Sequence, residues 1–287
     1  MSVDVEEWFH IPFGLDNILP FEQWDKATQR VQDVLPRILD IFEQNHSTAT
    51  FFILGWIAEK YPNLVKDIQK HGHEIATHGY AHKLIYNQTM HEFDTDIYKA
   101  KSILENITGQ NIIGYRAPGF SITPKTEWAF DVLARHGIKY DSSIFPCKRF
   151  HGYHNKFNKE PIIVKTGNFE IIEFPQTVVD FGIFKLSCFG GGYFRLFPKT
   201  IFLMMAKIIK KSDRPLIFYI HPRDLDIYQP QIPFSLLKKI RHYINIEKTE
   251  QKLYDITSYF KFTSFEMLLS DMKFKEKLQH APCYKCH

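Results

Sequence analysis

Seven polar residues, spread over more than 200 positions, carry most of the chemistry that this sequence suggests. They are Asp4, Glu6, His78, His82, Arg116, Asp141 and His221. Nearly every one follows a short apolar run that predicts a strand. In a barrel of parallel strands, residues at the carboxyl ends of the strands converge on one mouth, where catalysis takes place. Two imidazoles with a carboxylate suit a metal ion, and the other residues add a base and an acid, which is sufficient for amide hydrolysis.

The histidine pair and the first acidic cluster together predict a metal site. His78 and His82 are four positions apart, so they can share one face of a helix or a tight turn. Along a strand, Asp4 and Glu6 lie on one face and Glu7 on the other. We therefore expect one divalent ion, Zn²⁺ above others, on Glu6, His78 and His82. Asp4 is left free as a base, and Glu7 stays an alternative third ligand.

Four further residues could complete a catalytic site. Arg116 could keep a buried carboxylate ionised by bidentate pairing. Gly119 allows close backbone approach, and its N–H could donate to an oxyanion. Asp141, hydrogen-bonded to His221, would raise the pKa of that imidazole and fix its tautomer, as a general acid requires.

A glycine run and an aromatic residue are candidates for substrate contact. The run Gly190-Gly191-Gly192-Tyr193 lacks the spacing of a dinucleotide-binding motif. It predicts a flexible loop, or a loop that lets a polymer lie against the backbone at Gly191 with Tyr193 as a platform. Trp8 is a further candidate for substrate binding.

Composition excludes several classes of protein. The chain has 287 residues, 44% hydrophobic and 24% charged, which is typical of a globular protein. A net charge of +4 is too weak to predict nucleic-acid binding. Basic residues concentrate at 236–252 and 260–277, as solvated helix faces or as a contact for an anionic glycan or a membrane surface. With no 18-residue apolar run and no signal peptide, we expect a cytoplasmic protein, with the inner face of the membrane as a second expected location. The oligomeric state stays open.

The four cysteines do not predict a disulfide framework. Cys147, Cys188, Cys283 and Cys286 are too few and too unevenly spaced. The ending Cys283-Tyr-Lys-Cys286-His287 matches a haem attachment pattern or a weak zinc site, but it lies at the extreme terminus after a Lys-rich stretch. No role is assigned to it, and we expect a mobile tail at 276–287.

Strand and helix patterns alternate along the chain. Predicted strands cover 1–5, 49–54, 74–77, 112–115, 139–141 and 215–220, and predicted helices cover 31–42, 62–71, 93–107, 125–136 and 199–210, with two more within 234–259. Pro36 indicates a kink or a later start for the first helix. This order predicts an α/β fold, a parallel sheet wrapped by helices, with a β-rich insertion at 145–198. We expect one domain over 1–287, with the motifs within 1–225 and a helical part at 226–275.

Taken together, residues 1–225 resemble the NodB-homology polysaccharide deacetylases, whose fold is a distorted (β/α)7 barrel. Five segments match the family's motifs in order: 2–6, 78–82, 116–119, 140–142 and 216–221. The resemblance implies that Asp4 is the base, oriented by Arg116, and that Asp141 supports the acid His221. The family commonly has adjacent aspartates, but Val5 holds the second place in this sequence. A subgroup with an Asp-x-Glu pattern places the metal carboxylate two residues on, which implies Glu6.

The segments 2–10, 49–56 and 190–195 look most like the subgroup associated with exosortase-linked exopolysaccharide clusters. The resemblance implies a metal-dependent hydrolase that removes N-acetyl groups from an amino-sugar polysaccharide or its lipid-linked precursor. An O-acetyl esterase or a small-amide hydrolase on the same fold is an alternative. A non-haem iron oxygenase, which uses the same ligand set, and a carbohydrate-binding protein without catalysis also stay open. The expected partner is an N-acetylated glycan, and no nucleic acid is expected.

Overall fold

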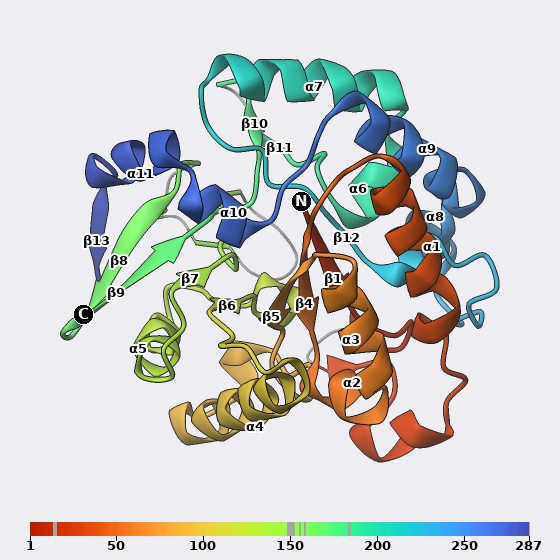
Figure 1. Ribbon diagram of the computed structural model, residues 1–287. Coiled ribbons are helices and arrows are strands. Elements are labelled where there is room, and N and C mark those ends of the chain that lie inside the picture. The colour runs from red at the N-terminus through yellow and green to blue at the C-terminus, as the bar shows by residue number, and fades with distance from the viewer. Residues whose placement is uncertain (14–15, 148–152, 155, 158, 183–184, 287) are drawn as a thin grey trace.

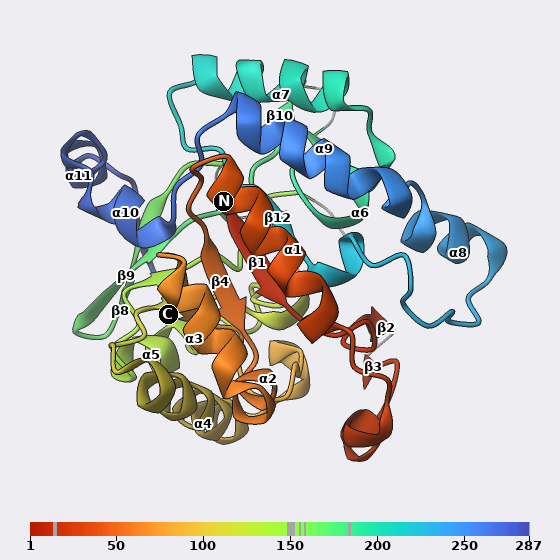
Figure 2. The ribbon, with the colours of Figure 1, turned by 45° about the vertical axis from the view of Figure 1, so that its right-hand side comes forward.

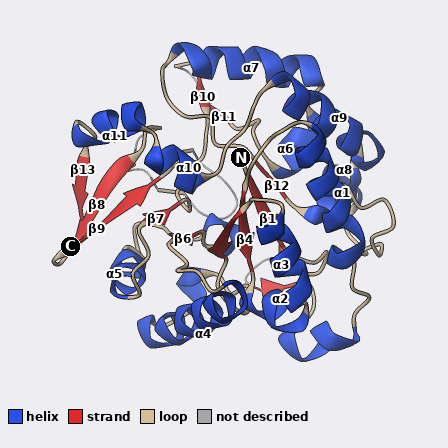
Figure 3. Ribbon diagram, in the orientation of Figure 1, coloured by secondary structure: helices blue, strands red, loops and turns tan. Residues whose placement is uncertain are grey.

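A computed structural model of the protein describes residues 1–13, 16–147, 153–154, 156–157, 159–182 and 185–286. Strands occupy the centre of the molecule and one side of it, and helices surround the central strands (Figures 1 and 3). None of the helices in the described ranges combines the length and the hydropathy needed to cross a bilayer.

The elements follow one another in the order expected of an α/β protein. The strands are β1 (Ser2–Val5), β2 (Pro12–Phe13), β3 (Asp16–Asn17), β4 (Thr50–Ile53), β5 (Glu74–Thr77), β6 (Gly114–Tyr115), β7 (Tyr140–Asp141), β8 (Ile162–Thr166), β9 (Phe169–Glu173), β10 (Val179–Asp180), β11 (Lys185–Leu186), β12 (Tyr219–Ile220) and β13 (Cys283–Lys285). The α-helices are α1 (Val31–Gln44), α2 (Gly55–Lys60), α3 (Pro62–Lys70), α4 (Met90–Thr108), α5 (Trp128–Arg135), α6 (Gly191–Leu196), α7 (Lys199–Lys211), α8 (Leu236–Tyr243), α9 (Ile246–Tyr259), α10 (Phe265–Ser270) and α11 (Met272–Gln279). Short 3-10 helices are η1 (Phe21–Lys26), η2 (Ile85–Asn87), η3 (Pro118–Phe120) and η4 (Pro222–Asp224).

The main sheet has nine strands in the order β12-β1-β4-β5-β6-β7-β9-β8-β13. The pairings from β12 through to β9 are all parallel. The predicted α/β fold with a mostly parallel sheet is therefore confirmed. Because these strands run in one direction, their carboxyl ends, and the residues that follow them, lie at one end of the sheet.

The far edge of the sheet differs from the prediction. β9 pairs parallel to β7, with Asp141 opposite Glu173, so part of the predicted insertion is a regular strand of the main sheet. β8 then pairs antiparallel to β9, and β13 pairs parallel to β8. Helix α11 and strand β13 therefore occupy most of the segment for which a mobile tail was predicted.

The terminal cysteines lie on strand β13 and directly after it. Alternation along a strand turns Cys283 and Cys286 toward opposite faces. Cys283 is exposed, whereas Cys286 packs with Tyr284 against a cluster of buried residues. This arrangement does not gather the two thiols around one metal ion, and His287 lies outside the described residues.

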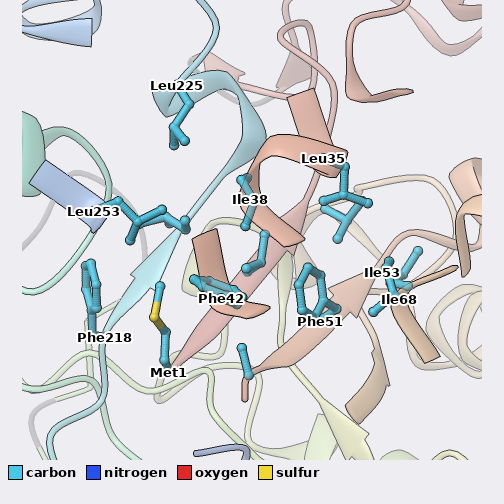
Figure 4. Packing of buried hydrophobic residues seen from close by; sticks show 14 of the residues in the cluster. Met1, Leu35, Ile38, Phe42, Phe51, Ile53, Ile68, Phe218, Leu225 and Leu253 are labelled. Atoms are coloured by element: carbon cyan, nitrogen blue, oxygen red, sulfur yellow. The ribbon is translucent and has the colours of Figure 1, made fainter. Parts of the chain in front are cut away.

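Helix α1 covers the first strands on one side. It begins at Val31 and contains Pro36, so of the two predicted alternatives, a kink or a later start, the later start does not occur. Its apolar positions recur at helical spacing and face the sheet. Ile38 and Phe42 belong, with Phe51 of β4, to one cluster of buried side chains (Figure 4). This packing fixes β1 and β4, and β1 introduces the first acidic residues of the site.

Candidate active site

Strand β1 divides its side chains between the core and the site. Val3 and Val5 are fully buried in the apolar cluster beneath α1. The alternate residues, Ser2 and Asp4, face the Arg116 guanidinium, which donates to Ser2 Oγ at 2.8 Å and to Asp4 Oδ1 at 2.6 Å. The period of two in Ser-Val-Asp-Val thus builds a hydrophobic face and a polar face in four residues.

Three side chains that are far apart in sequence converge on one point. Glu6 follows β1, and His78 follows β5, with His82 in the turn after it. One ligand atom from each of the three lies within 4.8 Å of the others, and all three residues are buried. Glu6 Oε1 is 2.9 Å from His78 Nε2 and 3.0 Å from His82 Nε2.

The tautomer of His78 indicates whether Glu6, His78 and His82 could bind a cation. Its Nδ1 lies 2.7 Å from the carbonyl oxygen of Arg116, which can only accept, so Nδ1 carries the proton. In the neutral imidazole, Nε2 is then an acceptor that faces another acceptor, the Glu6 carboxylate. Two acceptors in contact require a proton or a cation between them, and metal-binding histidines are held by this kind of outer hydrogen bond. The donor set therefore fits a divalent metal ion.

The two histidines share the site because of a tight turn rather than a helix. Gly79 has φ 76° and His82 has φ 48°, both in the left-handed region. Asp96 of α4 holds the turn by accepting hydrogen bonds from the backbone N–H groups of Tyr80 (2.7 Å) and Ala81 (3.2 Å). The side chain of a distant helix therefore brings His82 back toward Glu6.

The structure distinguishes Glu6 from Glu7. The Glu7 carboxylate accepts hydrogen bonds from the backbone N–H groups of Arg30 (2.9 Å) and Val31 (3.0 Å), so it caps the amino end of α1. Burial raises the Glu7 pKa to about 7 despite these bonds. Glu6 points to the histidines instead, and its second oxygen pairs with Arg223. Burial disfavours the Glu6 anion, but the charge of Arg223 and the nearby imidazoles hold its pKa well below the usual value.

Arg116 holds Asp4 in a fully buried position. Besides Ser2 and Asp4, the guanidinium donates to the Ser142 carbonyl oxygen at 3.0 Å and to Ser142 Oγ at 3.1 Å. The Arg116 side chain is inaccessible to solvent, and Asp4 nearly so. A cation fixed by this many hydrogen bonds holds the Asp4 carboxylate in one orientation. His221 Nε2 lies 3.8 Å from Asp4 Oδ2, so the predicted base and the predicted acid are neighbours.

The structure replaces the predicted hydrogen bond between Asp141 and His221. His221 Nδ1 lies 3.1 Å from Asp224 Oδ2, which also accepts the His221 backbone N–H at 2.9 Å. Asp224 is buried and pairs through its other oxygen with Arg195. Asp141 instead accepts from Ser143, at 2.6 Å from Oγ and 3.1 Å from the backbone nitrogen. The Asp141 carboxylate is thus bonded within its own turn, to the residue two positions later. The partner of His221 also comes from a local turn, three positions later in the sequence.

A further expectation about His221 is corrected, and Asp141 has a second partner. Burial, reinforced by the charge of Arg223, lowers the His221 pKa well below its usual value, whereas a raised pKa was predicted. Asp141 forms a buried carboxyl pair with Glu173, its neighbour on β9. Burial and the Asp141 charge raise the Glu173 pKa well above its usual value.

The two predicted glycines lie close to the catalytic candidates, Gly119 after Arg116 and Gly191 beside His221. Gly119 has φ 60° and lies in η3, three residues after Arg116. Gly191 has φ 49° and begins α6, and a Cβ built on it would lie 3.6 Å from His221 Cε1. A Cβ on Gly190 would lie 2.0 Å from the Tyr219 ring, so this position admits only glycine. The glycine run is therefore packed against β12 and opens a helix, where a flexible loop was predicted.

The two aromatic candidates are placed differently from the metal ligands. The Tyr193 ring lies nearly parallel to that of Phe197, with centroids 6.3 Å apart. Trp8 is partly buried, and its indole N–H donates to the Thr28 carbonyl oxygen at 2.9 Å. Trp8 also contacts Phe9 edge-on, so its observed contacts are those of a packed residue.

Sequence reasoning missed four residues that support the site: Ser2, Arg195, Arg223 and Asp224. Ser2 could have been found, because it alternates with Asp4 on one strand face. Asp224 also had a local signal, since it follows His221 by three residues in His-Pro-Arg-Asp. Arg195 and Arg223 had none, because their pairing with Asp224 and Glu6 depends on how distant segments pack.

Two regions of the chain are similar to known protein families. Residues 21–140 match the polysaccharide deacetylase family, and residues 142–270 match a domain of unknown function, DUF3473. A peptidoglycan deacetylase of Helicobacter pylori is 31% identical over 134 residues, which cover 47% of this chain and 41% of that protein. A peptidoglycan-N-acetylglucosamine deacetylase of Bacillus cereus is 38% identical over 95 residues, covering 33% and 34% of the two chains. The matches span less than half the length of either relative.

A solved structure shares the fold. The crystal structure of a candidate polysaccharide deacetylase from Mycobacterium smegmatis superposes with a TM-score of 0.60 at 16% identity, covering 88% of this chain and 80% of that one. At this identity the likeness concerns the fold alone. Residues 21–140 are therefore similar to the polysaccharide deacetylase family, and residues 142–270 are similar to DUF3473.

Proposed function

We propose that this protein is a metal-dependent hydrolase that removes N-acetyl groups from an amino-sugar glycan. The observation that carries the proposal is the meeting of Glu6, His78 and His82, with Asp4 beside them. The family region at 21–140 and the deacetylases similar to it support the acetylated glycan as the class of substrate. An exopolysaccharide or another cell-envelope glycan is the specific substrate that we propose.

The metal ligands in this proposal are Glu6, His78 and His82. A divalent ion, with Zn²⁺ the best match to the donor set, would polarise the acetyl carbonyl group and lower the pKa of a bound water. The Arg116 carbonyl oxygen holds the His78 ring with its Nε2 lone pair toward Glu6. Arg223 occupies the second oxygen of Glu6 and so limits the carboxylate to one free oxygen.

Asp4 is the proposed general base, because Arg116 fixes its orientation beside the three proposed metal ligands. His221 is the proposed general acid, which protonates the departing amine from Nε2. Asp224 would stabilise the doubly protonated imidazole through Nδ1, and Arg195 would hold Asp224 in place. We assign Asp141 a supporting role beneath the site, because its carboxylate is bonded to Ser143.

Backbone and aromatic groups complete the proposed site. The Gly119 N–H would donate to the oxyanion that forms on the acetyl group. Gly191 would let the glycan approach His221 closely, since no side chain stands there. Tyr193 and the partly buried Trp8 would supply aromatic surface for sugar rings.

The direct test is release of acetate by the zinc-loaded protein from a panel of N-acetylated glycans. Replacing Asp4 with Asn should lower the rate by about 10²–10⁴-fold and leave the metal content unchanged. Measuring free amine against free alcohol separates this activity from O-deacetylation. Metal-loaded, folded protein that releases no acetate from any member of the panel would contradict the proposal.

A further inference from the structure

Helix α8 turns its apolar side to solvent. Leu236, Leu237 and Ile240 are 74%, 81% and 51% exposed. At 100° per residue, these three positions lie on one side of the helix. A surface helix normally buries its apolar stripe against the core. Here residues 236–240 are all exposed, so the stripe is available to something outside the chain.

The carboxyl end of α8 attaches it to the protein. His242 Nε2 lies 3.3 Å from Gln229 Oε1, and Tyr243 Oη accepts the Ile232 backbone N–H at 2.9 Å. The position of α8 is therefore fixed by hydrogen bonds to the loop that precedes the helix. It does not reflect a helix without tertiary contacts.

The charge of α8 indicates what the exposed stripe contacts. Its sequence, Leu-Leu-Lys-Lys-Ile-Arg-His-Tyr, has three basic residues and no acidic one. The loop before it exposes two further large side chains, Ile227 (48%) and Tyr228 (73%). An apolar stripe on a helix whose charged residues are all basic, with an aromatic residue nearby, is the pattern of helices that lie in the interface of a membrane.

We propose that α8, with Ile227 and Tyr228, binds the surface of an anionic lipid bilayer. Leu236, Leu237 and Ile240 would enter the boundary between headgroups and acyl chains, and Lys238 and Lys239 would contact anionic headgroups. A second copy of the chain fits this face less well. A two-fold contact through α8 would bring its basic residues close to the same residues of the other copy, with no acidic residue on the helix to balance them.

The location of α8 gives this contact a consequence for the candidate site. The chain runs from His221 through η4 and a short loop directly into α8, and Gln229 in that loop donates to the Arg223 carbonyl oxygen at 2.8 Å. Helix α8 also packs against α6, which begins at Gly191 beside His221. It protrudes from the body of the molecule beyond α9 (Figure 2). Binding through α8 would hold the candidate site close to the lipid surface. None of the proposed lipid-binding residues belongs to the metal site, so this proposal does not depend on the proposed function.

The test is co-sedimentation of the full chain with vesicles of phosphatidylcholine alone or mixed with phosphatidylglycerol. The wild-type protein should bind the mixed vesicles and bind the neutral ones more weakly. The double variant Leu236→Ser/Leu237→Ser should bind the mixed vesicles at least about tenfold more weakly. Lys238→Glu/Lys239→Glu should weaken binding at low salt and have a smaller effect at high salt.

A matched control uses two exposed apolar residues elsewhere, Met267→Ser/Met272→Ser on α10 and α11, which should bind as the wild type does. Circular dichroism confirms that each variant is folded. Wild-type protein that does not bind the mixed vesicles at low salt would overturn the proposal. So would equal loss in the control variant, or a concentration-dependent dimer that Leu236→Ser/Leu237→Ser abolishes.

Discussion

The two flanks of the candidate site are built in different ways. On the metal flank, the predicted neighbours lie together: Glu6 with His78 and His82, and Asp4 with Arg116. On the acid flank, the predicted partner of His221 is replaced by Asp224. The metal flank comes from the ends of β1, β5 and β6, whereas the acid flank depends on a turn and on Arg195. Strand ends place residues predictably, and turns supply partners that motifs alone do not reveal.

The largest expected effect is on the metal flank. His78→Ala removes one of two imidazole ligands, so bound zinc and acetate release should both fall to background. His71→Ala, an exposed histidine just before the same strand, is the matched control and should keep both. Zinc per chain by elemental analysis, together with the acetate assay, checks this. Full zinc content in folded His78→Ala would place the metal elsewhere.

The acid flank should respond to Asp224 and much less to Asp141. Asp224→Asn should lower kcat by about 10²-fold, with metal content and KM little changed, because the imidazolium of His221 loses its partner. The pH profile of kcat should also move, which a purely structural defect would not cause. Asp141→Asn is the comparison, and we expect kcat within about threefold of the wild type. A larger loss of kcat in Asp141→Asn than in Asp224→Asn would indicate that Asp141 is the partner of His221, as the motif predicted.

Substitutions at the adjacent residues Glu6 and Glu7 should have different effects, one on zinc binding and the other on the free energy of unfolding. Glu7→Ala removes the cap of α1, so the free energy of unfolding should fall by about 1–2 kcal/mol while zinc binding is retained. Glu6→Ala should lose zinc instead. Urea denaturation and elemental analysis on the same preparations measure both quantities. Loss of zinc in Glu7→Ala, with Glu6→Ala unaffected, would exchange their roles.

The smallest effect concerns the buried carboxyl pair beneath the acid flank. The folded-state pKa of Glu173 is raised above its unfolded value, so its contribution to stability is complete below the unfolded pKa. That contribution is lost as pH rises through the folded-state pKa, because both carboxylates are then charged and buried. Glu173→Gln needs no proton, so its free energy of unfolding should depend less on pH over this range. Identical pH profiles for wild type and variant would argue against a raised pKa of Glu173.

The sequence was sufficient for the fold class and for most of the residues at strand ends. Alternation along 2–5, helical spacing in 31–42 and the order of elements all predicted what the structure contains. Three features could not be predicted. The turn that returns His82 to Glu6 depends on Asp96, the orientation of Glu7 depends on the position of α1, and β9 joins the sheet through pairing with β7. Each is a contact between distant segments, which local patterns do not encode.

Anomalous diffraction at the zinc absorption edge from crystals of the zinc-loaded protein tests the central claim most directly. We predict one strong peak bonded to a Glu6 oxygen and to Nε2 of His78 and His82, at about 2.0–2.2 Å from each. Asp4 should remain on Arg116 and outside the coordination shell. A peak held by other residues, or none at saturating zinc with Glu6 still in contact with both imidazoles, would contradict the account.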